Sequence, residues 1–337
     1  MADPAPRRVN VLPLGIDPAI AIRAAFLAGS AFVLLVYAIP LLRNRLLAYG
    51  PRSSVVPPID ASSNRANHYI AILDRLAAYR VPHNYFTHFY IVSVVGSLVW
   101  AQQLLTQGSI FNNIAQHASL SSRRPAMSFE SIVLAWMLLC VQGSRRLYES
   151  LVFSRSSKST MWVGHWALGL LFYVGIGLAI WIEGIPTMIQ EERFHHLQHD
   201  KQMSGAGRSI TYVITPSGRN VVFIPLFLLA SGLQYVTHKY LYSLPRYPGS
   251  SVVYTRPTHP TFSMSVTPHY FFEVLIYTSL TILSAPRGNV VNWTVACGLV
   301  FVTVNLGVTA IGTRQFWICT WGQESVRGKA NMIPLIW

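Results

Sequence analysis

Long apolar runs constrain this chain more than any other feature of its sequence. A helix of about 20 mostly apolar residues spans the hydrocarbon core of a membrane. Such segments lie at 19–42, 85–105, 128–150, 162–182, 220–242, 268–285 and 290–312. We therefore expect an all-α integral membrane protein whose seven transmembrane helices form one bundle. The segments that contain Glu130 and Glu273 fit least well, so six spans is the alternative count.

Composition excludes the common soluble classes. Hydrophobic residues make up 52% of the chain and charged residues only 11%, against about 25% charged residues in an average soluble domain. So small a charged fraction excludes a soluble enzyme, a disordered chain and a coiled coil. The net charge is +14, but the basic residues stand between apolar runs. Membrane lipid with anionic headgroups and a phosphate-bearing ligand are therefore the expected partners, rather than nucleic acid.

The charge of the loops predicts the orientation of the bundle. With the N-terminus in the lumen and the C-terminus in the cytosol, the cytosolic loops hold 15 Lys and Arg residues and the lumenal loops hold 9. We divide the chain into an N-terminal span with its basic loop, 1–84, and a membrane domain with a cytosol-facing cavity, 85–337. Within the basic loop, a helical pattern at 67–79 is expected to lie on the membrane surface.

The third apolar segment ends in a polar helix face. Gln142, Arg145, Arg146 and Glu149 stand at offsets of 0, 3, 4 and 7, which places all four on one side of a helix, with Tyr148 beside them. Ionisable residues at membrane depth are costly and usually face the interior of a bundle. A topology signal alone has no need of helical phase, so this face indicates a functional site.

Four other segments carry polar residues at the same predicted end. With the orientation above, all of them lie toward one cytosol-facing cavity. They are His88 and Tyr90 in the second segment, Gln234 and His238 in the fifth, His269, Tyr270 and Glu273 in the sixth, and Asn305, Thr309, Thr313, Arg314 and Trp317 in or just after the seventh.

The alternative interpretation of these residues is structural. Basic side chains at helix ends often extend to the cytosolic headgroups, and histidines often pack in a core. This interpretation covers Arg145, Arg146, Arg314, Lys329, His88 and His238 when each is taken singly. Glu273 is harder to explain in this way, because it lies more than a turn inside an apolar helix.

One histidine cluster and the absence of several motifs argue against a metal site and against three common enzyme folds. His195 and His199 have the spacing to share a metal ion, but they form a single cluster in a predicted lumenal loop, so we expect no metal site. The sequence contains no GxGxxG, GxxxxGK[ST] or GxSxG motif, which argues against a Rossmann domain, a P-loop and a hydrolase nucleophile elbow.

Five stretches of the sequence are distinctive. They are HFYIVSVV in the second segment, QGSRRLYES in the third, QYVTHKYLYSL in the fifth, PHYFFEVLIYTSL in the sixth, and the closing IPLIW. Together they resemble the steroid 5-alpha-reductase family, above all its polyprenol or polyprenal reductase branch, which acts in dolichol synthesis. The resemblance runs from about Val81 to the C-terminus, and SRRLYES and PHYFFE are its most specific parts.

The resemblance implies a multi-pass oxidoreductase of the endoplasmic reticulum membrane, in the lipid metabolism that supports protein glycosylation. The family binds NADPH in the bundle from the cytosolic side and saturates a carbon–carbon double bond conjugated to a carbonyl. Carried onto this chain, the cofactor-side residues are Arg145, Arg146, Tyr148, Glu149, Gln234, His238, His269, Tyr270 and Glu273.

Two positions depart from the family pattern. Gln142 stands where steroid-reducing relatives tend to carry a catalytic tyrosine, which argues against a steroid substrate. Arg314 follows Thr313 where the family usually has a histidine, and the Tyr-Pro that usually comes next is missing.

Chemistry favours an aldehyde substrate over an alcohol. Hydride attacks an electron-poor carbon, and only polyprenal has a carbonyl that accepts the charge. A Tyr hydroxyl or a protonated His beside the carbonyl would stabilise that charge, and spacing does not choose among Tyr148, His269, His88 and Tyr90. We place Glu273 with this catalytic group. The isoprenoid tail of the substrate is expected to leave sideways into lipid, with the first and second spans as walls.

The same chemistry extends the predicted cofactor site. The phosphates of NADPH call for cations, and Arg suits bidentate phosphate contact. The cations assigned to its phosphates are Arg145, Arg146, Arg246 and Arg314. Gln142, Asn305 and Trp317 complete the residues that we assign to NADPH in addition to those that the resemblance implies.

Three other functions stay open from the sequence. One is reduction of a 3-oxo-4-ene steroid. Another is a membrane methyltransferase like those that act on isoprenylcysteine, whose S-adenosylmethionine needs no cluster of arginines. The third is a non-catalytic membrane scaffold or transporter, which needs no convergence of Glu273 and the 142–149 face on one pocket.

The orientation is testable. Because the basic residues favour a cytosolic C-terminus, a glycosylation acceptor tag fused after Trp337 should stay unmodified in microsomes. The same tag fused before Met1 serves as the control and should be glycosylated. Efficient modification of the C-terminal tag would invert the orientation.

Overall fold

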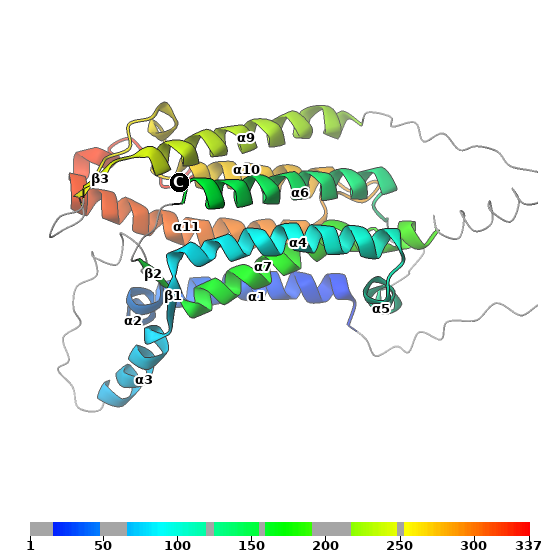
Figure 1. Ribbon diagram of the computed structural model, residues 1–337, viewed down its shortest axis with the longest axis horizontal. Helices are drawn as coiled ribbons and strands as arrows, with labels where there is room; N and C mark the ends of the chain where they lie inside the picture. Colours follow the sequence, from blue (N-terminus) through cyan, green and yellow to red (C-terminus); the bar gives the residue numbers. More distant parts are fainter. Residues whose placement is uncertain (1–15, 48–65, 119–124, 155–158, 191–216, 248–252) are drawn as a thin grey trace, which may run out of the picture.

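The computed structural model describes residues 16–47, 66–118, 125–154, 159–190, 217–247 and 253–337. Within these ranges the chain is an all-α bundle (Figure 1), as predicted. Its long helices are α1 (Pro18–Ala38), α4 (Phe86–Leu105), α6 (Phe129–Val152), α7 (Val163–Ile182), α9 (Gly218–Ser243), α10 (Pro268–Leu283) and α11 (Trp293–Trp321). The histidine cluster at 195–199 lies outside the described residues.

Five of these segments are long and apolar enough to cross a membrane. They are α1, His83–Leu105, α7, α9 and α11, and they make the chain a multi-pass membrane protein. Helices α6 and α10 fall short for different reasons: the charges of the 142–149 face lie in α6, and α10 has only 16 residues. They are the two segments that fitted least well in the sequence. In the bundle α10 packs along both α9 and α11, so much of its surface faces protein.

Shorter elements surround one end of the bundle. They are α2 (Pro40–Leu42), the π-helical turn η1 (Arg43–Leu47), α3 (Ala66–Ala78), β1 (Arg80–Pro82), η3 (His83–Tyr85), β2 (Thr160–Trp162), β3 (Arg246–Tyr247), β4 (Val253–Tyr254), η4 (Pro260–Phe262) and η5 (Gln323–Val326). Strand β1 pairs antiparallel with β2, and β3 pairs antiparallel with β4. Helix α5 (Ser109–His117) lies at the other end (Figure 1).

Aromatic rings join α1 to the rest of the core. Phe172 of α7 stacks on Phe301 of α11 with ring centroids 5.4 Å apart, and Phe26 of α1 lies 5.9 Å from Phe172. All three are buried in the main hydrophobic cluster. The N-terminal span therefore packs in the same bundle as the later helices, and the domain boundary at residue 84 stays a prediction.

Polar contacts fasten the end of the bundle opposite the short elements. Arg23 of α1 donates to Glu183 at 2.7 Å and to the Thr294 hydroxyl at 3.0 Å. Asn292 caps α11 by accepting from the backbone N–H groups of Thr294 and Val295, both at 3.0 Å. Its side-chain N–H donates to the Ser284 carbonyl at 3.2 Å. Asn292 is fully buried, so the Asn-Trp-Thr sequence at this point serves as a helix cap.

This cap can be tested by stability. Asn292→Ala removes the acceptor for two backbone donors and should lower the free energy of unfolding by about 0.5–2 kcal/mol. The measurement is the thermal unfolding midpoint of the purified protein in detergent. Ser217→Ala is the matched control, because Ser217 is the N-cap of α9 but makes no side-chain cap bond and is exposed. Equal midpoints for the two variants would contradict the assigned role.

Candidate active site

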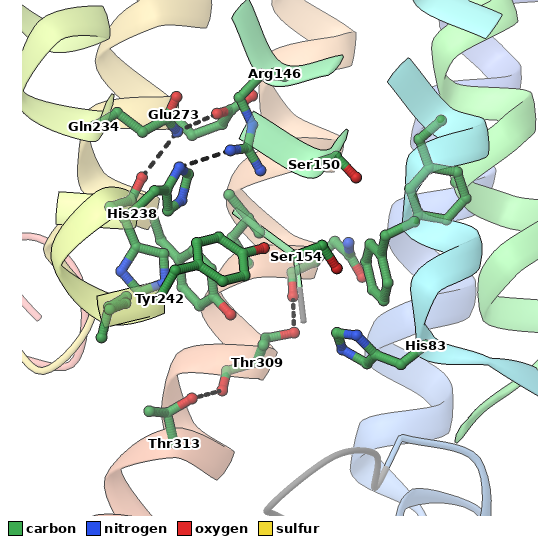
Figure 2. A pocket seen from close by; sticks show the side chains of 18 of the residues that line it. His83, Arg146, Ser150, Ser154, Gln234, His238, Tyr242, Glu273, Thr309 and Thr313 are labelled. Atoms are coloured by element: carbon green, nitrogen blue, oxygen red, sulfur yellow. Dashed lines mark hydrogen bonds between the residues drawn. The ribbon is translucent and has the colours of Figure 1, made fainter. Parts of the chain in front are cut away.

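A cavity of about 510 Å³ lies inside the bundle, between α4, α6, α7, α9, α10 and α11. This volume is within the range of about 300–1,000 Å³ that is typical of small-molecule sites. The five helices predicted to converge all contribute to its lining: Tyr90 from α4, Arg146 from α6, Gln234 from α9, His269 from α10 and Asn305 from α11. Figure 2 shows Arg146, Gln234, His238 and Glu273 grouped on one side of it.

The cavity has a polar part and an aromatic part. The polar part is formed by Tyr90, Arg146, Gln234, His238, His269, Glu273 and, along α11, Asn305, Thr309 and Thr313. The aromatic part is formed by Phe86, Phe89, Phe172, Tyr173 and Phe301, with Leu168, Gly169 and, beside Phe86, the rings of His83 and His165. A polar head with a long apolar tail is the ligand shape that such a division suits.

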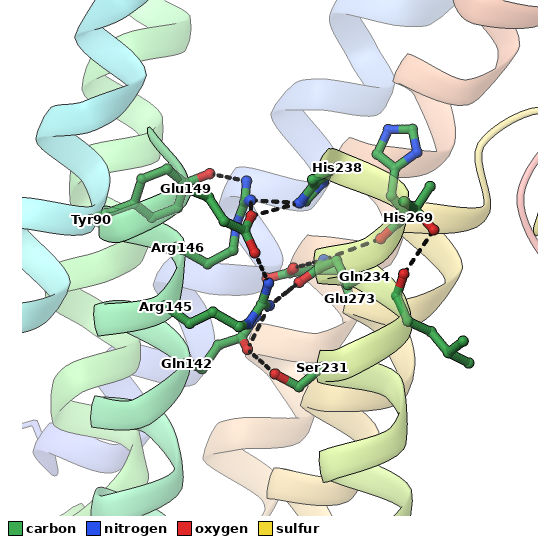
Figure 3. Close-up of polar contacts among 12 residues, drawn as sticks. Tyr90, Gln142, Arg145, Arg146, Glu149, Ser231, Gln234, His238, His269 and Glu273 are labelled. Atoms are coloured by element: carbon green, nitrogen blue, oxygen red, sulfur yellow. Dashed lines mark hydrogen bonds and ion pairs between the residues drawn. The ribbon is translucent and has the colours of Figure 1, made fainter. Parts of the chain in front are cut away.

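One buried carboxylate organises the polar part. Glu149 is 1% exposed, and its two oxygens accept hydrogen bonds from Arg145 and Arg146. His238 Nδ1 lies 2.8 Å from Glu149 Oε2 and 2.6 Å from Arg146 Nη1 (Figure 3). A ring nitrogen donates or accepts according to its tautomer, so Nδ1 donates to the carboxylate or accepts from the guanidinium. Arg146 also donates to the Tyr90 hydroxyl.

Glutamines extend this network across the bundle. Arg145 donates to Gln142 Oε1 at 2.9 Å and also to Gln234, and Gln142 donates to Gln234 at 3.1 Å. Gln234 in turn donates to Glu273 and to the His269 carbonyl (Figure 3). The carboxylate of Glu273 is therefore hydrogen-bonded, as a carboxylate inside an apolar helix must be.

The structure separates network residues from cavity residues. Gln142, Arg145 and Glu149 share the predicted helix face, but they are not part of the cavity lining. Among the described lining residues, Arg146 is the one Lys or Arg and Glu273 the one Asp or Glu. Arg145 and Arg146 each contact three side-chain partners. Because Arg145 does not line the cavity, its geometry suits positioning of the network and not binding of a ligand phosphate.

Three other predicted residues lie away from the cavity lining. Tyr148 is 50% exposed and packs on Phe153, because one residue before Glu149 the helix surface has turned outward. His88 packs against Tyr85, with ring centroids 4.4 Å apart. Arg314 donates to the carbonyl of Lys329 at 2.6 Å. The side chain of Arg246 lies outside the described set, although its backbone forms β3.

Arg314 fastens the C-terminal segment instead of lining the cavity. Besides Lys329, it donates to the Val326 carbonyl at 3.3 Å. Lys329 donates to the Phe262 and Ser263 carbonyls, and its pKa is lowered by burial and by the charge of Arg256. The segment thereby holds the chain at 262–266, where Phe262 and Val266 line the cavity.

Sequence reasoning missed several lining residues. Ser150 and Ser154 continue the face of Arg146 at steps of four, which the spacing could have shown. Helix α7 contributes a whole wall, and His165 near its start was the polar residue that could have indicated it. We expected the first span to form a wall, but α1 does not line the cavity, because Phe172 of α7 lies between Phe26 and the cavity.

The bundle is embedded in the membrane and holds an interior cavity that is polar in one part and aromatic in another. Such a cavity is typical of an intramembrane binding or catalytic site. Comparison with known proteins shows which family the chain resembles. Residues 187–337 match the model of the 3-oxo-5-alpha-steroid 4-dehydrogenase family. The predicted resemblance to the steroid 5-alpha-reductase family is thereby confirmed.

Three similar proteins from other organisms are all named polyprenal reductase. The chain is 25% identical over 328 residues to polyprenal reductase 2 of Oryza sativa subsp. indica, covering 88% of this chain and 89% of the relative. It is 28% identical over 227 residues to polyprenal reductase of Mus musculus, covering 61% and 64%. It is 26% identical over 257 residues to polyprenal reductase of Homo sapiens, covering 71% and 73%.

The role of Glu149 can be tested by stability. Glu149→Ala leaves two guanidinium groups without their shared carboxylate and should cost about 3–5 kcal/mol of unfolding free energy. Thermal unfolding of the purified protein in detergent measures this loss. Glu130→Ala, on the exposed first turn of the same helix, should cost no more than about 1 kcal/mol. Similar losses in the two variants would show that the network carries no such stability.

Proposed function

We propose that this protein is an NADPH-dependent reductase that saturates the alpha-isoprene double bond of a polyprenal, in the pathway to dolichol. The relatives named polyprenal reductase support the substrate class. The observation that carries the proposal is the Tyr90 hydroxyl, which Arg146 holds at the wall of a cavity with one polar and one aromatic part. This arrangement suits an aldehyde head with an isoprenoid tail.

The polar lining of the cavity is our candidate dinucleotide site. Asn305, Thr309 and Thr313 stand four residues apart on α11 and line the cavity. The Thr309 and Thr313 hydroxyls donate to the backbone carbonyls four residues earlier, so they face the cavity as acceptors. With Gln234, Tyr270 and Trp317, which also line it, they offer amide, hydroxyl and ring surfaces for a nicotinamide and its ribose. Arg146, on α6, supplies the positive charge of the described lining and shares it with Glu149. When bound, NADPH supplies the hydride for the reduction.

Tyr90 is the group that we assign to the substrate carbonyl. Its oxygen accepts from Arg146, which leaves its O–H proton free to be donated to an oxygen in the cavity. The neighbouring guanidinium favours negative charge near the phenol, so Tyr90 can stabilise the enolate oxygen that forms as the double bond is reduced. His269 lines the same part of the cavity and is the second candidate for this role.

Glu273 and Gln234 are positioned to shape the polar part around this reaction. Gln234 contacts both Arg145 and Glu273, so it links the buried network on α6 to the cavity wall on α10. Glu273 orients this amide by accepting from it. The amide can then present a fixed polar surface to the head of the substrate or the cofactor.

The aromatic part is assigned to the isoprenoid units nearest the aldehyde. A side-chain carbon on Gly169 would lie 2.6 Å from the Phe89 ring, so a larger residue on α7 would have to displace this ring of α4. Both Gly169 and Phe89 line the cavity. Their contact sets the width of the aromatic part between these two helices.

We propose an endoplasmic reticulum membrane location with a cytosolic C-terminus.

The proposed role of Tyr90 can be tested with matched tyrosines. Tyr90→Phe should lower turnover of polyprenal by about 10²–10³-fold, because it removes the donor to the developing oxyanion. Tyr148→Phe removes a hydroxyl from the same bundle outside the cavity and should keep near-normal turnover. The assay is NADPH consumption by purified protein with polyprenal, polyprenol and a 3-oxo-4-ene steroid in parallel.

Three results would contradict the proposal. Near-normal turnover in Tyr90→Phe would remove this tyrosine from the mechanism. Faster NADPH consumption with the steroid than with polyprenal would assign the cavity to a different substrate. Wild-type protein that consumes NADPH with none of the substrates would favour a non-reductive function.

A further inference from the structure

We propose that α3 lies in the headgroup region of the membrane, with Ile72, Leu76 and Tyr79 in contact with lipid. Figure 1 shows α3 outside the bundle, near α2 and the β1–β2 pair, and slanted relative to the long helices. The helix belongs to none of the candidate spans. The inference concerns where the protein meets its membrane and does not depend on the proposed reaction.

Hydrogen bonds fix the depth of α3 relative to a spanning helix. Trp162 donates from its indole N–H to the Leu76 carbonyl at 2.9 Å. The backbone N–H of Val163, the first residue of α7, donates to the Tyr79 carbonyl, also at 2.9 Å. Since α7 is a candidate span, the last turn of α3 lies at the level where that span begins.

Two further contacts hold α3 at the same level. Asp74 forms an ion pair with Arg45 of η1, the turn that closely follows the first span. Strand β1 follows α3 directly and pairs with β2, and the second span, His83–Leu105, begins right after β1. Helix α3 is therefore tied to the ends of three spans at one face of the bundle.

The exposed side of α3 is apolar. Ile72, Leu76 and Tyr79 follow one helix face at steps of four and three, and they are 43%, 50% and 67% exposed. Ile70, Leu73 and Ala77 form the more buried face. Three large apolar side chains at helical spacing are unfavourable in water but suit the boundary between headgroups and acyl chains.

Charge and continuity select a lipid surface as the partner. Arg75 is exposed on α3, one residue before Leu76, and Arg80 is exposed at the start of β1, where it donates to Thr160. Basic side chains next to an inserted face attract anionic headgroups. The candidate spans of the bundle expose large apolar residues to the same membrane. The apolar face of α3 thus continues a surface that lipid already covers, at the depth fixed by Trp162 and Val163.

The experiment measures the surroundings of labels on two faces of α3. Spin labels are attached at Ile72→Cys and, as the matched control, at Ala71→Cys, which is also exposed but lies one residue around the helix. The chain has its three native cysteines replaced by alanine and is reconstituted in nanodiscs of phosphatidylcholine and phosphatidylserine. Collisions with oxygen report lipid, and collisions with a water-soluble nickel chelate report water.

We expect the ratio of oxygen to chelate accessibility to be several-fold higher at position 72 than at position 71. Leu76→Cys is a second label on the same face and should give the same result as position 72. Equal chelate accessibility at 71, 72 and 76 would place the apolar face in water and overturn the proposal. Shielding of 72 and 76 from both oxygen and chelate would also overturn it, because a protein partner or a second copy would then cover the face.

Discussion

The buried carboxylate of Glu149 is the contact on which the polar interior of this bundle depends. Two guanidinium groups and an imidazole surround it, and each of these groups would be costly to bury alone. Their mutual pairing lets several polar side chains persist in the interior of a membrane protein. It also commits their geometry: Arg145 is turned into the network, and Arg146 is turned toward Tyr90 and the cavity.

The polar network and the aromatic wall lie mainly on different helices of the bundle. Helices α6, α9 and α10 carry the hydrogen-bonded groups, and α11 adds its column of amide and hydroxyl side chains. Helices α4 and α7 add aromatic rings, and Phe89 of α4 packs on Gly169 of α7. The proposed substrate, a lipid with a reactive polar head, would need both surfaces within one cavity. The two surfaces meet where α4 contributes Phe89 and Tyr90 as successive residues, on opposite sides of this division.

Much of the site could be predicted because helical phase is a local property. The offsets among Gln142, Arg145, Arg146 and Glu149 place them on one face whatever surrounds the helix, and the structure joins all four in one network. The same argument could not separate a residue that lines a cavity from one that supports it. Tyr148 and Arg314 stand next to residues of the site in sequence, yet packing and the C-terminal backbone draw them elsewhere.

The sequence by itself determined the membrane class, the helices and the end of the bundle where polar residues gather, because apolar length and helical spacing are written in the local chain. Only the tertiary structure decided which partners the polar groups would take on other helices and which helices would enclose the cavity. Helix α7 shows the reason: apart from His165, its lining residues Leu168, Gly169 and Phe172 carry no local mark of function, and they become a cavity wall only through their place in the bundle. The pairing of Arg145 and Arg146 with Glu149 follows from spacing along α6, whereas a contact such as Gln234 with Glu273 depends on the distance between two helices.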